Sequence, residues 1–258
     1  MGRIIAVANQ KGGVGKTTTS INLAAGLAAT RRKVLLVDMD AQGNATMGVG
    51  VNKAGLKRTG CNVLLGESDA AAAIVDLPEL GLALLPGNAD MTAAEVGLRG
   101  KKHGELALRN ALKPVRGRYD FIIIDCPPAL SMLTVNALSA CDGVLITMQC
   151  EYYALEGLAA LLDTIGKVRA VINPELQIEG ILRTMYDPRN NLSGQVSEQL
   201  TGHYPELVYR TIIPRNVRLA EAPSHGLPVL RYDPASSGAE AYLALAGEVL
   251  RRTEKRAA

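Results

Sequence analysis

Aromatic residues are scarce in this chain of 258 residues, which has no tryptophan, one phenylalanine and an aromatic content of 3%. Nearly half of the residues, 48%, are nevertheless apolar. The core must therefore be built from Ala, Val, Ile and Leu rather than from large rings, which is typical of a buried parallel sheet covered by helices. Because α/β proteins of this length commonly have one core, we expect a single domain over residues 1–258.

Cysteines and long apolar runs are also few. The apolar run Ile4–Ala8 is too short for the core of a signal peptide, and no stretch approaches the ~18 residues needed to span a membrane. We therefore expect a cytoplasmic protein that does not bind a membrane. The cysteines have no CxxC spacing, which excludes the usual zinc and redox dithiol motifs and favours reduced, buried thiols. They are Cys61, Cys126, Cys141 and Cys150.

The net charge of +3 is too small to indicate a nucleic-acid-binding protein, because such binding needs a clustered basic patch. The last segment, Ala239–Lys255, has apolar residues followed by basic ones and so resembles a membrane-binding tail. Bulky apolar anchors are few in it, however. We expect instead a final helix that packs on the sheet and ends in a solvated basic turn.

Short β-branched runs alternate with longer segments of helical periodicity. This alternation predicts βαβ units and an α/β fold in which a mostly parallel, twisted sheet is flanked by helices. Strands are expected at Ile4–Ala8, Lys33–Asp38, Leu82–Leu85, Phe121–Asp125, Val144–Met148, Ile178–Arg183 and Val208–Tyr209. Helices are expected at Thr17–Ala29, Glu105–Leu112, Ser131–Ser139, Leu155–Val171, Gln195–Thr201 and Gly238–Arg252, and Asp69–Ala73 is read as part of another.

The first strand runs into the segment NQKGGVGKTT at residues 9–18, and helical periodicity begins directly afterwards. In this context a glycine-rich loop wraps backbone N–H groups around phosphate oxygens, and the helix N-terminus adds its positive dipole. Lys16 would then lie near the β- and γ-phosphates, and the Thr17 hydroxyl would bind Mg²⁺. A plain turn between strand and helix is the alternative, but eight specified positions in the right order favour a phosphate-binding loop. We predict a P-loop NTPase architecture with ATP and Mg²⁺ as cofactors.

The standard pattern G-x-x-x-x-G-K-[ST] fails, because Gln10 replaces its first glycine and is followed by a second lysine, Lys11. The loop instead resembles the deviant Walker A motif, K-G-G-x-G-K-[ST]-T, of the ParA/MinD ATPase superfamily. The resemblance implies that Lys11 reaches across a homodimer interface to the partner's nucleotide and that Gly12 lies where the two subunits meet. The nucleotide-binding residues are then Lys11, Gly12, Gly13, Val14, Gly15, Lys16, Thr17 and Thr18.

Carboxylates end two of the predicted strands, where ligands collect in open α/β sheets. The segment VLLVDMDAQGN, residues 34–44, resembles a second family motif, V-D-x-D-P-Q-G-N, with Ala41 in the usual place of proline. The match implies that Asp40 positions the attacking water and that Asp38 lies in the second shell of the metal or binds one of the metal's waters. Asp125, after a hydrophobic strand, is expected to hold Mg²⁺ through water. Helix capping is the alternative role for either carboxylate taken alone.

Three later segments resemble the chromosomal ParA/Soj subgroup: QCEYYALEG at residues 149–157, RTMYDPRN at 183–190 and TIIPRNVRLAEAPSHG at 211–226. The resemblance then spans almost the whole chain. It implies that Pro214, Arg215 and Asn216 form a loop beside the adenine, where a backbone or amide group reads the base edge. Met185 would pack on the face of the base. Without the family match, Pro214 would be read as an ordinary turn proline.

The segment from Arg183 to Arg231 has six arginines, four acidic residues and no lysine. Guanidinium groups grip phosphate in two-point contacts, which suits backbone contact with DNA. Arg189 and Arg218 match family positions implicated in DNA binding, and Arg183 and Arg215 are candidates to assist. Since no helix-turn-helix or zinc finger accompanies them, we expect sequence-independent binding of double-stranded DNA that salt weakens and that needs the dimer. Solvated surface arginines are the alternative.

The resemblance as a whole implies an ATP-dependent dimerising switch for DNA segregation, cytoplasmic and nucleoid-associated. The ATP-bound dimer binds DNA, intrinsic hydrolysis is slow, and a centromere-binding partner of the ParB/Spo0J type stimulates hydrolysis and release. One alternative is a MinD-like membrane-cycling ATPase, which needs a C-terminal amphipathic anchor. Another is a metabolic ATPase of the same superfamily, either an amide-forming enzyme or an iron–sulfur reductase, although paired cluster cysteines are not found.

Overall fold

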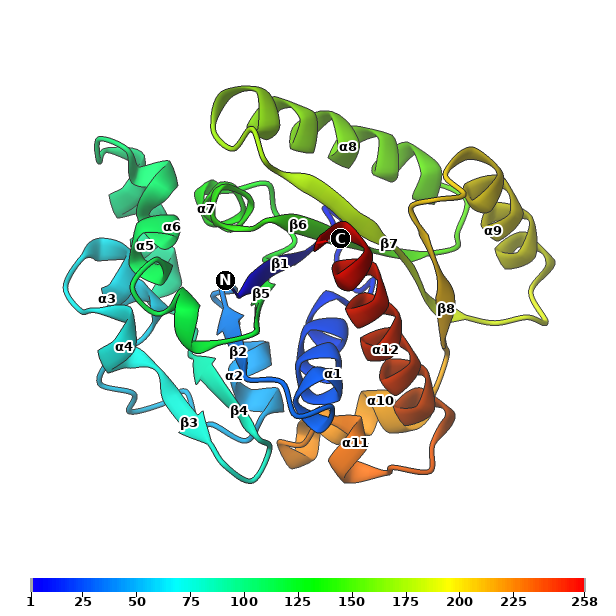
Figure 1. Cartoon of the computed structure of the whole chain (residues 1–258), viewed down its shortest axis with the longest axis horizontal. Helices are drawn as coiled ribbons and strands as arrows, with labels where there is room; N and C mark the ends of the chain where they lie inside the picture. Colours follow the sequence, from blue (N-terminus) through cyan, green and yellow to red (C-terminus); the bar gives the residue numbers. More distant parts are fainter. Residues whose placement is uncertain (1, 258) are drawn as a thin grey trace.

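The computed structural model describes residues 2–257. Their strands form one eight-stranded sheet in the order β3-β4-β2-β5-β1-β6-β7-β8, parallel throughout except for β3 (Figure 1). This arrangement confirms the predicted α/β class with a mostly parallel sheet. The strands are β1 (Arg3–Ala8), β2 (Val34–Asp38), β3 (Val75–Leu77), β4 (Leu82–Leu85), β5 (Phe121–Asp125), β6 (Gly143–Gln149), β7 (Gln177–Tyr186) and β8 (Val208–Pro214).

Helices cover both faces of the sheet (Figure 1). They are α1 (Lys16–Ala29), α2 (Asn44–Gly48), α3 (Gly60–Leu65), α4 (Ala70–Ala73), α5 (Met91–Arg99), α6 (Ala107–Leu112), α7 (Met132–Ala140), α8 (Ala154–Val171), α9 (Asn191–His203), α10 (Val217–Glu221), α11 (Val229–Tyr232) and α12 (Ser237–Ala257). Short 3₁₀ turns occur at Gly104–Leu106, Arg116–Arg118 and Ala222–His225.

The alternating side chains of the strands divide the core into two layers. On β1, Ile4 and Ala6 face the layer filled by α3 to α9, whereas Ile5 and Val7 face the layer filled by α1, α2 and α10 to α12. Because both faces are covered, the central strands β1, β2 and β5 are apolar along almost their whole length. This explains why short continuous apolar runs were sufficient to locate them.

The predicted strands all occur, with ends that differ by a few residues except in β8, which extends to Pro214. β3, at the sheet edge, was missed because it has only three residues and is followed directly by Pro78. The helix α5 was also missed, since Gly97 and Gly100 interrupt its apolar periodicity. The helical reading of Asp69–Ala73 is confirmed as the single turn α4.

The final helix α12 packs on the body of the protein, as predicted. Tyr242, Leu245 and Val249 are fully buried against α1 and β8, and Leu243 is the exposed large apolar residue of this helix. In residues 2–257 no helix has the length and apolar character needed to cross a membrane.

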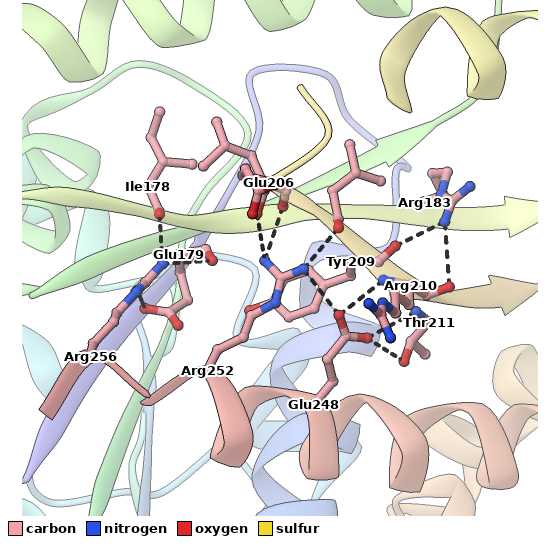
Figure 2. Close-up of polar contacts among 12 residues, drawn as sticks. Ile178, Glu179, Arg183, Glu206, Tyr209, Arg210, Thr211, Glu248, Arg252 and Arg256 are labelled. Atoms are coloured by element: carbon pink, nitrogen blue, oxygen red, sulfur yellow. Dashed lines mark hydrogen bonds and ion pairs between the residues drawn. The ribbon is translucent and has the colours of Figure 1, made fainter. Parts of the chain in front are cut away.

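The basic end of α12 differs from the prediction, because it is not simply solvated. Arg252 donates to the carbonyl oxygens of Leu207 and Val208 at 3.2 and 2.8 Å, and its guanidinium lies 4.1 Å from the centre of the Tyr209 ring (Figure 2). Arg256 donates to the fully buried Glu179 at 2.6 Å. Two arginines of this turn thus fasten the helix to β7 and β8.

Glu179 is the centre of an ionic cluster at the amino edge of the sheet. Arg3, at the start of β1, donates at 2.5 Å to the same carboxylate oxygen that Arg256 contacts. Nearby, Glu248 of α12 accepts hydrogen bonds from the backbone N–H groups of Arg210 and Thr211, both at 2.9 Å (Figure 2). These N–H groups belong to the edge strand β8, so the carboxylate also covers an otherwise open sheet edge.

The four cysteines are buried and free, as predicted from their spacing.

Candidate nucleotide-binding site

The loop between β1 and α1 has the backbone conformation that its glycines were predicted to provide. Gly13 and Gly15 have φ values of 73° and 82°, in the left-handed region, and α1 begins at Lys16. A side chain at these positions would cost roughly 1–2 kcal/mol of backbone strain at each. Gly12 and Gly13 have no other atoms within 4 Å of the position where a Cβ would lie. The loop therefore has open space beside Gly12 and Gly13, and it leads directly into the N-terminus of α1.

Lys16 lies over this loop with little exposure. Its Nζ atom donates to the carbonyl oxygen of Lys11 at 2.9 Å, and the residue is 7% exposed. Burial lowers the pKa of this ammonium, while Asp125 and Asp40 oppose the shift. The side chain is thus held against the backbone of the loop that was predicted to bind phosphate.

Two fully buried carboxylates lie side by side, because Asp38 and Asp125 are register partners at the ends of β2 and β5. Asp125 accepts hydrogen bonds from the hydroxyls of Thr17 and Ser20, each at 2.8 Å. Burial and the charge of Asp38 raise the pKa of Asp125. In the described chain neither carboxylate has an ion-pair partner.

Asp38 is held by backbone and hydroxyl donors of the loop that follows it. Its Oδ2 accepts from the backbone N–H and the hydroxyl of Thr46, both at 2.7 Å, and Oδ1 accepts from the N–H of Asp40 at 3.1 Å. Burial raises the pKa of Asp38 despite these bonds. Thr46 was not singled out from the sequence, although its hydroxyl also accepts from the N–H of Gly87.

Asp40 is half-buried and borders a cavity in front of the P-loop. The turn after it forms without the usual proline, because Gly43 at φ 61° donates its N–H to the carbonyl oxygen of Asp40 at 2.9 Å. The N–H of Gln42 donates to Oδ1 of Asp40 at 2.9 Å. Ala41 in this turn therefore removes no contact that positions the carboxylate.

The cavity has a volume of about 720 Å³, within the range of small-ligand sites. It brings together residues from the two halves of the chain that were predicted to bind nucleotide. These are Gly12, Gly13, Gly15, Lys16, Thr17, Thr18, Asp40, Met185, Pro214, Arg215 and Asn216. Sequence reasoning missed the lining residues Gln42, Asn44, Pro128, Thr184, Ile213, Val217, Leu219, Ala220 and Tyr242, most of which carry no distinctive chemistry.

The wall of the cavity formed by β7 is tied to the P-loop. Thr184 donates its hydroxyl to the carbonyl oxygen of Val14 at 2.9 Å, which explains why Val14 is buried rather than part of the lining. Met185, the next residue, has φ 49°, a left-handed conformation that is unusual for a residue with a side chain. The backbone is thus bent where Met185 faces the cavity.

Asn216 lines the opposite wall, but its side-chain amide forms hydrogen bonds within the protein. The Oδ1 atom accepts from the N–H groups of Arg218 and Leu219 and so caps α10, and Nδ2 donates to Ser237 at 2.9 Å. Capping and the bond to Ser237 thus use Oδ1 and one of the two N–H donors of Nδ2, so of the backbone and amide groups predicted to read the base edge, the amide retains one donor. Backbone groups of the loop remain open to the cavity.

Lys11 lies outside the cavity lining. Its Nζ atom pairs with Glu151 at 2.5 Å, and both side chains are about half exposed. Next to Glu151, Tyr152 and Tyr153 form an exposed edge-to-face pair whose ring centres are 5.0 Å apart. This ion pair was not foreseen, because Glu151 lies far along the sequence from the loop.

Comparison with known proteins agrees with this geometry. A family model described as an AAA domain matches residues 2–178. The chain is 51% identical over 249 residues to the sporulation initiation inhibitor protein Soj of Bacillus subtilis, covering 96% of this chain and 98% of that protein. It is 50% identical to the chromosome partitioning protein ParA of Myxococcus xanthus, covering 98% of this chain and 89% of that protein. The chain belongs to the ParA/Soj family of chromosome-partitioning ATPases.

Solved structures similar to this ParA/Soj-family chain include proteins with other names. A cobyrinic acid a,c-diamide synthase from Mycobacterium smegmatis with bound ADP and magnesium is 39% identical, with a TM-score of 0.86 over 98% of this chain and 96% of that one. The cell division ATPase MinD of Pyrococcus furiosus is 29% identical, with a TM-score of 0.81 over 97% and 99%. The P-loop ATPase fold predicted from the sequence is thereby confirmed.

The four arginines proposed from the sequence to contact DNA differ in their exposure. Arg189, Arg215 and Arg218 are exposed, whereas Arg183 is buried. Arg183 donates to the hydroxyl of Ser197 at 2.8 Å, and it also donates to the carbonyl oxygen of Tyr209 at 2.8 Å (Figure 2). The prediction that Arg183 assists DNA contact is therefore wrong, because its guanidinium joins α9 to β8 inside the fold.

Proposed function

We propose that this chain is an ATP-dependent dimerising switch for DNA segregation. One observation carries the proposal: the deviant P-loop with Lys16 lies directly beside two buried carboxylates, Asp38 and Asp125, that no basic side chain pairs with in residues 2–257. Buried charges of one sign are costly unless something of the other sign joins them. A phosphate-bound divalent cation has the charge and the position to do so.

ATP and Mg²⁺ are the ligands that fit these residues. The loop N–H groups, Lys16 and Thr18 would hold the phosphates, and the adenine would lie between Met185 and Pro214 at the far wall of the cavity. Thr17 would bind Mg²⁺, with Asp125 and Asp38 acting directly or through water. When bound, Mg²⁺ neutralises phosphate charge, and it commonly takes one or two carboxylates together with phosphate oxygens.

Hydrolysis of ATP would depend on Asp40. Its carboxylate borders the cavity and keeps one oxygen bonded to the N–H of Gln42, which fixes its direction toward an attacking water. Because phosphoryl transfer needs mainly positioning and charge stabilisation, Lys16 and Asp40 supply the chief protein contributions. We infer slow intrinsic turnover, accelerated by dimerisation and by a partner of the ParB/Spo0J type.

Lys11 is proposed to act in the partner subunit of an ATP-bound homodimer. It lies outside its own cavity lining and is half exposed beside Glu151, and Gly12 leaves open space next to it. Both features support close approach of a second subunit at this surface. The exchange would replace the Glu151 carboxylate by a phosphate of the partner's nucleotide, which carries more negative charge.

Double-stranded DNA is the proposed ligand of Arg189 and Arg218, with Arg215 assisting. Arg189 lies in the loop after β7, and Arg215 and Arg218 lie in the loop and helix after β8; the two strands are parallel neighbours with Tyr186 and Pro214 in register. The arginines therefore extend from one edge of the sheet, and a dimer doubles the number of phosphate contacts. Binding without sequence preference would place the ATP-bound protein on the nucleoid in the cytoplasm.

The test is DNA binding with ATP, with ADP and without nucleotide, each across a salt series and with two unrelated DNA sequences. We expect binding only with ATP, equal for both sequences, and a log affinity that falls linearly with log salt by about 0.9 per phosphate contact. Lys16→Ala should lose both hydrolysis and binding, while Asp40→Ala should retain ATP and accumulate as a DNA-bound dimer. Lys167→Ala, on the exposed face of α8, is the control. Sequence-specific or nucleotide-independent binding contradicts the proposal.

Two alternatives predict different results in the same assays. A MinD-like ATPase would sediment with anionic liposomes when ATP is bound, but the apolar residues of α12 are used in the core, which argues against an anchor. An amide-forming enzyme, the activity named for the Mycobacterium smegmatis relative, would hydrolyse ATP only with a carboxylic acid and an amide donor. Such an enzyme would bind no DNA in any nucleotide state.

A further inference from the structure

Both arginines proposed to contact DNA are already paired with carboxylates of their own chain. Asp187 accepts two hydrogen bonds from the guanidinium of Arg189, at 2.9 and 2.8 Å, in a two-point arrangement. Arg218 pairs with Glu221 at 2.9 Å and with Asp233 at 3.2 Å. The Arg189 guanidinium lowers the pKa of Asp187 to about 2, so this partner is charged at any physiological pH.

Each of these ion pairs lies next to a wall of the nucleotide cavity. Asp187 follows Met185 by two residues at the end of β7, and the N–H of Arg215 donates to the carbonyl oxygen of Tyr186 at 3.1 Å. Arg218 is the second residue of α10, which Asn216 caps from the cavity wall. A change at the nucleotide is therefore only a few residues away from both pairs.

We propose that Asp187, Glu221 and Asp233 are intramolecular counter-charges that hold the DNA-facing arginines in the free protein and are displaced by DNA phosphates. This inference rests on the DNA binding proposed above and concerns its regulation. We refer to the three residues as the acidic clamp.

The acidic clamp sets a threshold for binding because carboxylate and phosphate compete for the same donors. An exposed ion pair is a weak interaction, strong enough to weaken one arginine–phosphate contact but not to outweigh several at once. A single subunit then gains little from DNA, whereas a dimer that presents twice as many arginines exceeds the threshold. The clamp therefore lowers the affinity of a single subunit until its few contacts give little binding, while the dimer still binds because it has twice as many contacts.

The clamp also predicts a change in salt dependence. Salt weakens the intramolecular ion pair, so at high salt less attraction is given up when the arginine moves to phosphate, and this offsets part of the salt dependence of the DNA contact. A free arginine has no such offset, so each arginine released from the clamp should steepen the slope of log affinity against log salt, by at most about 0.9. Simple removal of a remote negative charge would not produce this change.

The test uses Asp187→Asn and the double variant Glu221→Gln/Asp233→Asn in the full-length protein with ATP, because Arg218 pairs with both of the latter carboxylates. Asparagine retains the oxygen that accepts the N–H of Arg189 at 3.0 Å, so the turn before α9 is preserved while the charge is removed. Glu95→Gln is the matched control, because Glu95 pairs with Arg99 at 3.0 Å on α5, which lies on the opposite side of the molecule from α9 and α10 (Figure 1). Affinity for duplex DNA is measured by fluorescence anisotropy across a salt series.

We expect each clamp variant to bind DNA about two- to fivefold more tightly, with the steeper salt slope, and Glu95→Gln to match wild type. The gain should disappear when Arg189→Ala is added to Asp187→Asn. Wild-type affinity and slope in both clamp variants would overturn the acidic clamp and leave the proposed function intact. Failure of wild type and variants alike to bind DNA in any nucleotide state would overturn the proposed DNA binding and the clamp together.

Discussion

Buried carboxylates have different partners at the amino ends of the strands, here called the amino edge of the sheet, and at the carboxyl ends, the carboxyl edge. At the amino edge, Glu179 is fully buried and is neutralised by Arg3 and Arg256. At the carboxyl edge, Asp38 and Asp125 are equally buried, but within residues 2–257 their donors are hydroxyl and backbone groups alone. A carboxylate paired with arginine has its charge already satisfied and serves the fold. Carboxylates without a cationic partner can instead interact with a bound cation. The difference therefore distinguishes Glu179, which stabilises the fold, from Asp38 and Asp125, which are available to a ligand.

Glu179→Ala tests the structural edge and has the largest expected effect. It leaves Arg3 and Arg256 without their carboxylate, and the free energy of unfolding should fall by about 3–5 kcal/mol. Urea denaturation measures the change. Glu175→Ala, an exposed glutamate just before β7, should cost less than about 0.5 kcal/mol. A loss as small as the control's would mean that the ionic cluster contributes nothing.

Asp125→Asn tests the functional edge, where activity and stability should change in opposite directions. ATP hydrolysis should fall about 10²- to 10³-fold, because a charged group at the metal and phosphates is lost. The protein should be at least as stable as wild type at neutral pH. Folding raises the pKa of Asp125, so its ionisation opposes folding above the ordinary carboxyl pKa.

The control for this variant is Asp120→Asn, since Asp120 lies just before the other end of β5 and accepts the N–H of Lys33. Steady-state phosphate release and thermal unfolding measure both properties. Hydrolysis by Asp125→Asn within tenfold of wild type would remove Asp125 from the mechanism.

Glu248→Gln tests whether a buried carboxylate near the amino edge stabilises the fold in a pH-dependent way. Burial opposes ionisation of Glu248, but N–H groups of Thr211 and Arg210 outweigh it and lower the pKa of this carboxyl. Its stabilisation is therefore present above the ordinary glutamate pKa and is lost as pH falls through the lower folded value. We expect a loss of about 1.5–3 kcal/mol at pH 7 that shrinks in acid, measured by urea denaturation at several pH values. A difference independent of pH would contradict this assignment.

Asn216→Ala should have the smallest effect, about 1 kcal/mol, because it removes a helix cap. The loss should be accompanied by weaker ATP binding, since the capped helix α10 forms one wall of the cavity. Asn190→Ala removes the corresponding cap of α9, which does not line the cavity, and should leave ATP affinity unchanged. Calorimetric titration with ATP distinguishes the two. Equal ATP affinities in both variants would show that the cap of α10 does not contribute to ATP binding.

The sequence predicted the functional edge far better than the structural one. The P-loop, Asp38 and Asp125 could be found because a strand, a turn and a helix start lie within a few consecutive residues, and local patterns record them. The partners of Glu179 could not, because Arg3 and Arg256 are 176 and 77 residues away. Arg183 was misjudged for the same reason: its charge is visible in the sequence, but its burial between α9 and β8 is not.

The sequence by itself determined the order of the longer strands and helices apart from α5, the glycine loop and the carboxylates at the strand ends, because each depends on neighbours in the chain. Only the tertiary structure decided which charges meet. It placed Lys11 beside Glu151, tied Thr184 to the carbonyl oxygen of Val14, and paired Arg218 with Asp233. Pairing depends on distances between side chains that the sheet brings together, and the parallel strands of this fold join residues more than 100 positions apart.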